Sequence, residues 1–326
     1  RLPAWFATIG IVWLTWCLAN HARGAAVARW STLVLSTMAL TYISAGAVMT
    51  DTFLVFGTTL SLVSMWFVLS GRSDYWRWWF FVGLAIGLLS KGPLAVVLTV
   101  TPLVLWAAIF RQQLQPLKKL PWLLGSLLTL AIAVPWYVLA ELKTPGFLNY
   151  FIIGEHFSRF LDPGWAGDLY GSAHDRPKGM IWIFWLWASF PWGIIGLVGF
   201  GLAAARGKTK DIFTGAVQDA STLYLLFCAI TPMLFFTLAG NTLWTYILPS
   251  LPFSAILIAG WVSKLDLGAW SRVRSGAVLL VPVLITLVVF ISVSGVIPLK
   301  TEKQLISRYE SIHQAGDSPI FYIGEM

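Results

Sequence analysis

The segment Gly154-Glu155-His156-Phe157-Ser158-Arg159-Phe160 carries three side chains suited to chemistry. The guanidinium of Arg159 can bind two phosphate oxygens at once. The carboxylate of Glu155 and the imidazole of His156 can orient such a group or help to hold a divalent metal ion. Glu155 and Arg159 are also four residues apart, so on a helix they could form a structural ion pair. The sequence leaves both interpretations open.

Three further polar residues lie beside long apolar runs. Asp51 could cap the N-terminus of a helix, or it could assist catalysis as a carboxylate that orients the substrate. Lys91 precedes Gly92-Pro93 and could extend its ammonium group to the membrane interface or bind an anionic headgroup. Tyr246 could belong to an aromatic belt or donate its hydroxyl to a phosphate oxygen. We expect all six side chains to converge on one outward-facing cavity: Asp51, Lys91, Glu155, His156, Arg159 and Tyr246.

The composition is that of a membrane protein rather than a soluble domain. Hydrophobic residues make up 58% of the 326 residues and charged residues only 11%, and the mean hydropathy is +0.77. A membrane-spanning helix needs about 20 mostly apolar residues. Continuous runs rich in Leu, Ala, Gly and Trp favour helices over the alternating short strands of a barrel. We predict an all-α polytopic protein with about ten spans, near 3–18, 31–49, 53–70, 79–90, 94–110, 122–140, 179–205, 223–240, 246–262 and 276–297.

The distribution of Lys and Arg predicts the orientation. Most of them fall in short loops on one side of the predicted spans, which the positive-inside bias assigns to the cytoplasm. Asp51, Lys91, the segment 141–178 and the turn before Tyr246 then face outward. The net charge of +8 is accounted for by basic loops beside anionic membrane lipids, so no nucleic-acid partner is needed.

Two segments differ from the apolar background. The segment 141–178 is long and polar, and apolar residues at three- and four-residue intervals near its start predict an amphipathic helix at the interface. The glycines and prolines after that helix are typical of a mobile lid. The tail 299–326 has the pattern of a helix, a turn and a strand. We therefore expect a transmembrane domain over 1–298, with its N-terminal part upstream of Arg1, and the start of a C-terminal outward-facing α/β domain over 299–326.

Several motifs are absent from the sequence. It has no D-x-D triplet, no G-x-x-x-x-G-K-[ST] phosphate loop and no H-E-x-x-H zinc motif. The predicted spans also lack charged residues near their centres, where proton relays and ion-coupled carriers usually have them. These absences argue against cytosolic nucleotide chemistry and against ion-coupled transport.

In these features the chain resembles the phospholipid-carrier-dependent glycosyltransferases. These are the bacterial relatives of protein O-mannosyltransferases and of the aminoarabinose transferase that modifies lipid A. The matching stretches occur in family order: Arg1-Leu2-Pro3, Ala47-Val48-Met49-Thr50-Asp51, Gly87-Leu88-Leu89-Ser90-Lys91-Gly92-Pro93, Gly154 to Leu161, Phe190-Pro191-Trp192 and Thr245-Tyr246-Ile247-Leu248-Pro249. The resemblance implies the GT-C fold and a hexosyl or pentosyl transferase. It also implies a polyprenyl-phosphate sugar donor, and transfer to a lipid, glycan or protein acceptor at the periplasmic face of the bacterial inner membrane.

The resemblance also assigns roles and shows two departures. The principal catalytic Asp of the family lies in the first outward loop, upstream of Arg1, so Asp51 is expected to assist. The family often has a Lys and a Pro just before Thr-Tyr, where this chain has Asn241 to Trp244. Arg159, Lys91 and Tyr246 are donors suited to the charge that grows on a departing phosphate. The alternative function is a non-catalytic flippase or carrier of lipid-linked sugars, with the same cluster as a headgroup site.

Overall fold

The computed structural model describes residues 1–263, except residue 73 and residues 168–173. They fall within one compact unit, Arg1–Leu265. The regular structure of these residues is helical, with one isolated β-bridge between Asp175 and Asn241. The all-α prediction is therefore confirmed. The predicted span 276–297 and the tail 299–326 lie outside the described residues, so the division into 1–298 and 299–326 stays a prediction.

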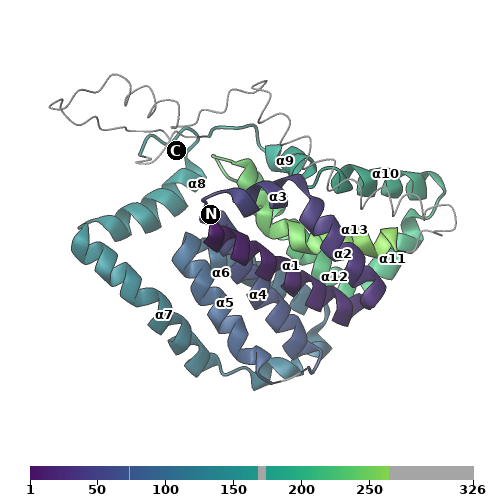
Figure 1. The fold of residues 1–326 in the computed structure, drawn as a ribbon, viewed down its shortest axis with the longest axis horizontal. Coiled ribbons are helices and arrows are strands. Elements are labelled where there is room, and N and C mark those ends of the chain that lie inside the picture. Colours follow the sequence, from purple (N-terminus) through teal and green to yellow (C-terminus); the bar gives the residue numbers. More distant parts are fainter. Residues whose placement is uncertain (73, 168–173, 264–326) are drawn as a thin grey trace. The chain divides into compact units, whose positions relative to one another are not determined.

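The helices follow one another with short connections (Figure 1). The first half of the chain forms α1 (Leu2–Arg23), α2 (Ala25–Thr37), α3 (Ala39–Gly46), α4 (Asp51–Leu69), α5 (Trp76–Lys91), α6 (Leu94–Ile109), the 3₁₀ helix η1 (Arg111–Lys119) and α7 (Trp122–Lys143). The second half forms the π-helix η2 (Asn149–Ser158), α8 (Arg159–Leu161), α9 (Met180–Ala188), α10 (Trp192–Ala205), α11 (Thr209–Gln218), α12 (Ala220–Thr237), the 3₁₀ helix η3 (Trp244–Ser250) and α13 (Leu251–Val262).

Fewer helices than predicted are long enough to cross a membrane on their own. Within the described residues, five are: α1, α4, α7, α12 and the continuous stretch Trp244–Val262. The pair α9 and α10 adds a sixth if it counts as one span, although it bends by 109°. The remaining predicted spans are broken or short. The run 31–49 is divided at Met38, which has an extended backbone, and α5 and α6 have 16 residues each.

Helix α4 forms the centre of the bundle, and its backbone lies very close to that of α5. In its most apolar stretch of 18 residues, 78% of the residues are buried. A Cβ atom on Gly57 would lie 2.6 Å from the carbonyl oxygen of Gly83, so only glycine fits there. Ser61 Oγ donates a hydrogen bond to the carbonyl of Phe80 (2.9 Å). Small residues and hydroxyl groups of this kind hold membrane helices together. The contact brings the first residue of α4 beside the last residue of α5.

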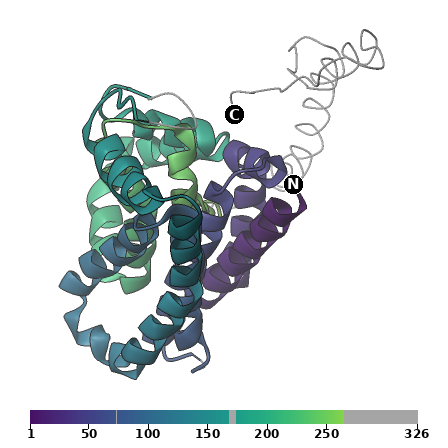
Figure 2. The same cartoon turned by 90° about the vertical axis from the view of Figure 1, so that its left-hand side faces the viewer.

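Helix α7 lies at the margin of the bundle, on the side that faces the viewer in Figure 2. In its most apolar stretch of 18 residues, only 17% of the residues are buried. One face is attached to α5, since Thr129 Oγ1 donates to the carbonyl of Phe81 (2.9 Å) and Tyr137 Oη donates to that of Leu88 (2.5 Å). An apolar helix exposed on its remaining faces is suited to lipid contact.

The end of the bundle opposite the start of α4 is basic. Arg23, at the end of α1, forms a 2.8 Å ion pair with Asp219, and Arg77 donates to the carbonyl of Lys119 in η1 (3.2 Å). Asp219 also caps α12 by accepting a hydrogen bond from the backbone N–H of Ser221 (3.0 Å). Burial opposes ionisation of Asp219, but the hydrogen bonds from Thr222 and Ser221 and the charge of Arg23 outweigh it, so its pKa lies below the ordinary value.

Candidate active site

An ion pair joins the start of α4 to the end of α5. Lys91 Nζ lies 3.4 Å from Asp51 Oδ2, and the two side chains are 30% and 13% exposed. The close α4–α5 contact places the two residues together although they are 40 positions apart in the sequence. The sequence offered each of them a separate structural role, as a helix cap and as an interfacial cation. The structure brings them together.

His156 connects this pair to the polar segment. Its Nε2 atom lies 2.7 Å from the carbonyl oxygen of Lys91, and its Nδ1 atom lies 2.6 Å from the carbonyl oxygen of Phe151. The imidazole is therefore held between two backbone carbonyls, one from α5 and one from η2. Gly92, with φ of +53°, makes this approach possible, since a Cβ atom there would lie 2.7 Å from the Phe151 ring. A fixed turn therefore holds Lys91 against η2.

Glu155 and Arg159 form the second ion pair. Arg159 Nη1 lies 2.8 Å from Glu155 Oε2, and the side chains are 17% and 20% exposed. Tyr150 Oη donates to the other oxygen of Glu155 (2.5 Å). The pairing that the four-residue spacing allowed is therefore present, and the carboxylate is held from both sides.

The predicted amphipathic helix is present, but most of it is a π-helix. Residues Asn149–Ser158 form η2, and α8 continues from Arg159. A π-helix places residues five apart above one another, whereas an α-helix aligns residues three and four apart. This explains why Tyr150 meets Glu155 and why the ring of Phe151 lies 4.9 Å from that of His156. π-Helical turns are frequent at functional sites.

Sequence analysis missed one residue that supports this segment, Asn241. Its Nδ2 atom donates to the carbonyls of Arg159 (2.6 Å) and Asp162 (2.7 Å), and its Oδ1 atom accepts from the backbone N–H of Gly164 (3.2 Å). Its side chain is buried, with the residue only 3% exposed. The sequence marked Asn241 only as a departure from the family pattern. Its role depends on contacts across about 80 residues, which no local spacing reveals.

Tyr246 lies in η3, five residues beyond Asn241. Its ring centroid lies 4.6 Å from that of Phe236, at an angle of 31° between the planes. Contacts link Asp51, Lys91 and His156 directly, and Glu155 and Arg159 belong to the same polar segment. That Tyr246 shares a cavity with these five residues stays a prediction.

The two candidate metal ligands already have other partners. Both ring nitrogens of His156 lie against carbonyl oxygens, and both oxygens of Glu155 are in contact with Tyr150 or Arg159. Among the residues that the structure describes, no group of three or more His, Cys, Asp or Glu side chains could hold an ion. This arrangement does not fit a metal ion.

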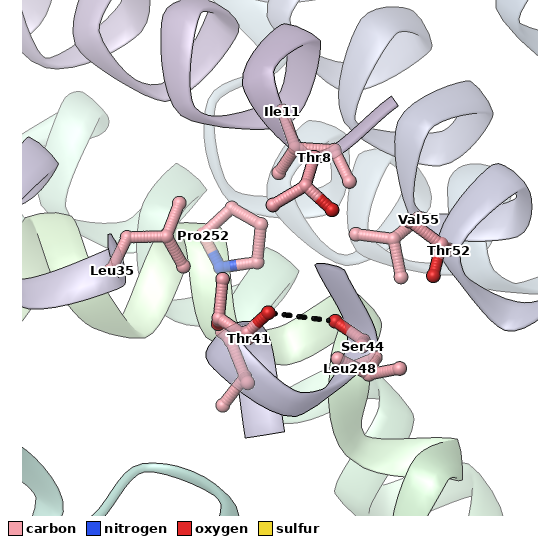
Figure 3. Close-up of a pocket in the computed structure, with 10 residues that line it drawn as sticks. Thr8, Ile11, Leu35, Thr41, Ser44, Thr52, Val55, Leu248 and Pro252 are labelled. Atoms are coloured by element: carbon pink, nitrogen blue, oxygen red, sulfur yellow. Dashed lines mark hydrogen bonds between the residues drawn. The ribbon is translucent and has the colours of Figure 1, made fainter. Parts of the chain in front are cut away.

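A small pocket lies in the bundle and is lined in part by the first turns of α4 (Figure 3). It lies between α1, α2, α3, α4 and the stretch formed by η3 and α13. Thr52, the residue after Asp51, and Leu248, two residues after Tyr246, both line it. Four of its lining side chains carry hydroxyl groups: Thr8, Thr41, Ser44 and Thr52.

The site therefore offers two cations, each neutralised by a carboxylate, at one end of a membrane bundle. Lys91 and Arg159 can bind the oxygens of a phosphate group if their carboxylate partners are displaced or shared. A freed Asp51 or Glu155 can accept a proton from a hydroxyl group. Such an arrangement suits the transfer of a group away from a phosphate.

The sequence comparisons agree with this chemistry. Residues 1–151 match the family described as dolichyl-phosphate-mannose-protein mannosyltransferase. Undecaprenyl phosphate-alpha-4-amino-4-deoxy-L-arabinose arabinosyl transferase 1 of Pseudomonas fluorescens is 29% identical over 288 residues, which cover 85% of this chain and 45% of that relative. Transferase 2 from another strain of that species is 31% identical over 216 residues, covering 64% of this chain and 33% of the relative. The chain thus spans less than half the length of these curated relatives.

The fold agrees as well. The crystal structure of ArnT from Cupriavidus metallidurans bound to undecaprenyl phosphate matches 91% of this chain and 50% of its own chain, with a TM-score of 0.68 and 19% identity. The apo structure of the same protein matches 83% of this chain and 47% of its own chain, with a TM-score of 0.65 and 20% identity. The GT-C fold expected from the sequence is therefore confirmed. In sequence, this multi-pass membrane chain is similar to proteins described as undecaprenyl-phosphate aminoarabinose transferases, and it shares the fold of ArnT.

Proposed function

We propose that this chain is part of a membrane glycosyltransferase that moves a sugar from a polyprenyl-phosphate donor to an acceptor hydroxyl or phosphate. The observation that carries the proposal is the pairing of Lys91 with Asp51 and of Arg159 with Glu155, joined through His156 at one end of the bundle. Two cations at the membrane boundary suit the headgroup of a lipid phosphate.

Arg159 and Lys91 stabilise the leaving group in this proposal. Transfer breaks the bond between the anomeric carbon and a phosphate oxygen, whose electron pair stays on the phosphate. Donors already held in place for that growing charge contribute strongly to catalysis. Glu155 and Asn241 fix Arg159 from its side chain and its backbone, and His156 fixes the backbone of Lys91.

Asp51 assists by accepting or orienting the acceptor proton. The new bond forms between the acceptor oxygen and the anomeric carbon, and the proton that leaves the acceptor needs a carboxylate base. A positioned base accelerates such a step by about 10²–10⁴-fold. Direct displacement inverts the anomeric centre.

The relatives suggest a narrower donor. The proteins named above are described as transferases for 4-amino-4-deoxy-L-arabinose linked to undecaprenyl phosphate. We propose that the donor here is an undecaprenyl-phosphate-linked aminopentose, which makes the enzyme a pentosyl transferase. The acceptor is a lipid, a glycan or a protein.

The proposed location is the bacterial inner membrane, with the site facing the periplasm. Contacts between chain segments support this orientation, because Arg23, Arg77 and Lys119 lie at the end of the bundle opposite Asp51. The positive-inside bias assigns that basic end to the cytoplasm. Cysteine labelling tests it: a cysteine in place of Gly46 should react with an impermeant maleimide from the periplasm, and one in place of Gly207 should not.

A direct transfer assay tests the proposed function. Purified full-length protein is mixed with radiolabelled undecaprenyl-phosphate aminoarabinose and lipid A, and the label that reaches the acceptor is counted. We expect transfer by the natural protein and strong loss in Lys91→Met and Arg159→Ala variants. The control Lys143→Met removes a cation from the end of α7 and should retain activity. If the natural protein moves no label to lipid A, to envelope glycans or to envelope proteins, the proposed function is wrong.

A further inference from the structure

Helix α11 has no part in the candidate site and packs little against the rest of the chain. None of the residues Thr209–Gln218 is buried. The helix contacts α12, and its Phe213 makes an edge-to-face contact with Phe200 of α10, with the ring centroids 6.4 Å apart (Figure 1). Because an isolated helix of about ten residues is marginal in water, we looked for a partner that stabilises it.

One face of α11 is apolar and exposed. At about 100° per residue, Ile212, Phe213 and Val217 fall within an arc of about 140° around the helix axis. These three side chains are 40%, 58% and 53% exposed, and together they are called the apolar face below. Asp211 and Thr214 project from the opposite side of the helix. Helices with this division of residues lie between an apolar phase and water.

Three cations lie at the start of the helix. Arg206, Lys208 and Lys210, called the basic triplet below, are all exposed. In the part of the chain that the structure describes, the four ion pairs involve other cations, so no carboxylate neutralises the triplet there. Uncompensated Lys and Arg beside an apolar face are typical of helices that bind anionic lipids.

The turn before α11 separates it from the preceding helix. Gly207 has a φ of +72°, its N–H donates to the carbonyl of Ala204 (2.9 Å), and the N–H of Lys208 donates to that of Ala203 (3.0 Å). These two hydrogen bonds define a Schellman motif, which ends a helix and redirects the chain. Helix α11 is therefore an element of its own and does not extend α10.

The neighbours of α11 indicate its depth in the membrane. Asp219 follows α11 directly and pairs with Arg23 at the basic end of the bundle. Near the end of α10, Phe200 and Leu202 are 45% and 54% exposed, which suits contact with lipid. Because Phe213 contacts Phe200, the apolar face of α11 continues the exposed apolar surface of α10 at the basic boundary.

We propose that α11 binds the surface of the cytoplasmic leaflet, with its apolar face among the acyl chains and its basic triplet on the phosphates of anionic lipids. The positive-inside bias assigns the basic end to that leaflet. The occupant is a lipid surface because the triplet complements the negative charge of anionic headgroups. The helix thereby anchors the connection between α10 and α12. This proposal goes beyond the transfer reaction and does not depend on it.

A fluorescent label tests where the helix lies. Full-length protein without other reactive cysteines carries either Phe213→Cys or Thr214→Cys, each labelled with the same environment-sensitive dye. Thr214 is the matched control because it is also exposed and lies on the polar side of α11. The protein is reconstituted into vesicles of phosphatidylcholine, with or without phosphatidylglycerol, that contain a lipid with a nitroxide quencher on its acyl chain. Quenching of the dye then measures its contact with the acyl chains.

We expect quenching at position 213 to be at least about threefold stronger than at position 214 in vesicles with phosphatidylglycerol. Without phosphatidylglycerol, quenching at position 213 should fall by about half or more, because the cations lose their anionic partners. Replacement of the whole triplet, by Arg206→Gln, Lys208→Gln and Lys210→Gln, should cause the same fall in anionic vesicles. Lys118→Gln with Lys119→Gln in η1 is the control, because it removes cations elsewhere at the basic end and should change nothing.

Three results would overturn the proposal. Equal quenching at positions 213 and 214 would show that the apolar face does not enter the lipid. A dye at position 213 that is protected from both the nitroxide lipid and aqueous iodide would show that protein covers this face instead. Quenching that is independent of phosphatidylglycerol and of the basic triplet would remove the anionic lipids. Sugar transfer is not measured in these experiments, so such results leave the proposed function unaffected.

Discussion

Each cation of the candidate site has a carboxylate within ion-pair distance. The effect of a single substitution on activity therefore depends on which partner of the pair is replaced. Arg159 and Lys91 are neither fully exposed nor sealed from solvent. A phosphate that enters must compete with Glu155 and Asp51 for them. Removal of a carboxylate and removal of a cation should therefore have different effects on activity.

The first prediction concerns Arg159→Lys. Lysine keeps the charge but lacks the planar fork that binds two phosphate oxygens. We expect a loss of about 2–4 kcal/mol of transition-state stabilisation, or about 30- to 1,000-fold in turnover, with little change in melting temperature. Arg77→Lys is the matched control, since Arg77 pairs with Asp74 at the basic end, and it should leave turnover unchanged.

The variant Glu155→Gln distinguishes phosphate binding by Arg159 from a purely structural ion pair with Glu155. If Arg159 served only to pair with Glu155, then Glu155→Gln would match Arg159→Ala in activity, and Arg159→Lys would be nearly normal. That pattern, at normal abundance in the membrane, would leave Arg159 as a structural residue and remove it from catalysis.

The second prediction concerns Asn241, a positioning residue. Asn241→Asp replaces a donor by a second acceptor opposite the carbonyls of Arg159 and Asp162. We expect turnover to fall by about 10-fold or more, because the backbone that carries Arg159 is released. The same change in an Arg159→Ala background should cost nothing further, as coupled residues behave non-additively. An equal loss in both backgrounds would show that Asn241 acts elsewhere.

At the scale of helices, the contact between α4 and α5 brings Asp51 to Lys91. Hydropathy alone predicted that most of the helices exist, because long apolar runs have few other solutions in a membrane. It did not predict that α2 and α3 are separate, or that α5 and α6 are short. The break at Met38 cannot be seen from hydropathy, because the apolar run continues through it. Such a break depends on packing against neighbouring helices.

The sequence also predicted the site only in part. The four-residue spacing of Glu155 and Arg159 allowed the ion pair that the structure shows, since that contact is local. The π-helical geometry, the pairing of Asp51 with Lys91 and the role of Asn241 all depend on contacts between segments far apart in the chain. Local spacing in one sequence does not show which distant segments meet. The glycines at positions 57, 83 and 87 were the available signal, because small residues mark close helix contacts in membranes.

The third prediction tests that helix contact. Gly57→Ala places a methyl group against the backbone of Gly83 and Gly87. We expect a loss of about 1–3 kcal/mol of stability and a lower melting temperature in detergent, together with reduced transfer as Asp51 moves from Lys91. Gly201→Ala in α10 is the control, because a Cβ atom there meets nothing within 4 Å. It should be neutral or slightly stabilising, and an equal loss in both variants would contradict the role of the contact.

The fourth prediction concerns the ion pair that joins α1 to α12. The pKa of Asp219 is lower in the folded protein than its ordinary value of 3.8. Its ionised form therefore adds stability that is complete above that value and is lost as the pH falls through the folded pKa. Asp219→Asn should lower the melting temperature at pH 7, and the difference from the natural protein should shrink below pH 4. A difference that is constant with pH would rule out this linkage.

At the scale of the whole molecule, the chain has a basic end and a site end. Arg23, Arg77 and Lys119 lie at the first, and Asp51 and Lys91 lie at the second. Exposed apolar faces such as that of α7 lie between the two ends. In the proposed function, a lipid substrate approaches through the bilayer while its headgroup reaches the site at the boundary. A transferase and a flippase share this arrangement, so the architecture alone does not separate them.

One measurement separates them most directly. Full-length protein is reconstituted into vesicles that contain undecaprenyl-phosphate aminoarabinose labelled in the sugar, with lipid A in the membrane. The covalent attachment of the label and its side of the bilayer are then both recorded. The proposed function predicts that label becomes covalently attached to lipid A, and that Arg159→Lys slows this step. Label that crosses the bilayer while it remains on undecaprenyl phosphate, with none on any acceptor, would contradict the proposed function and support a carrier.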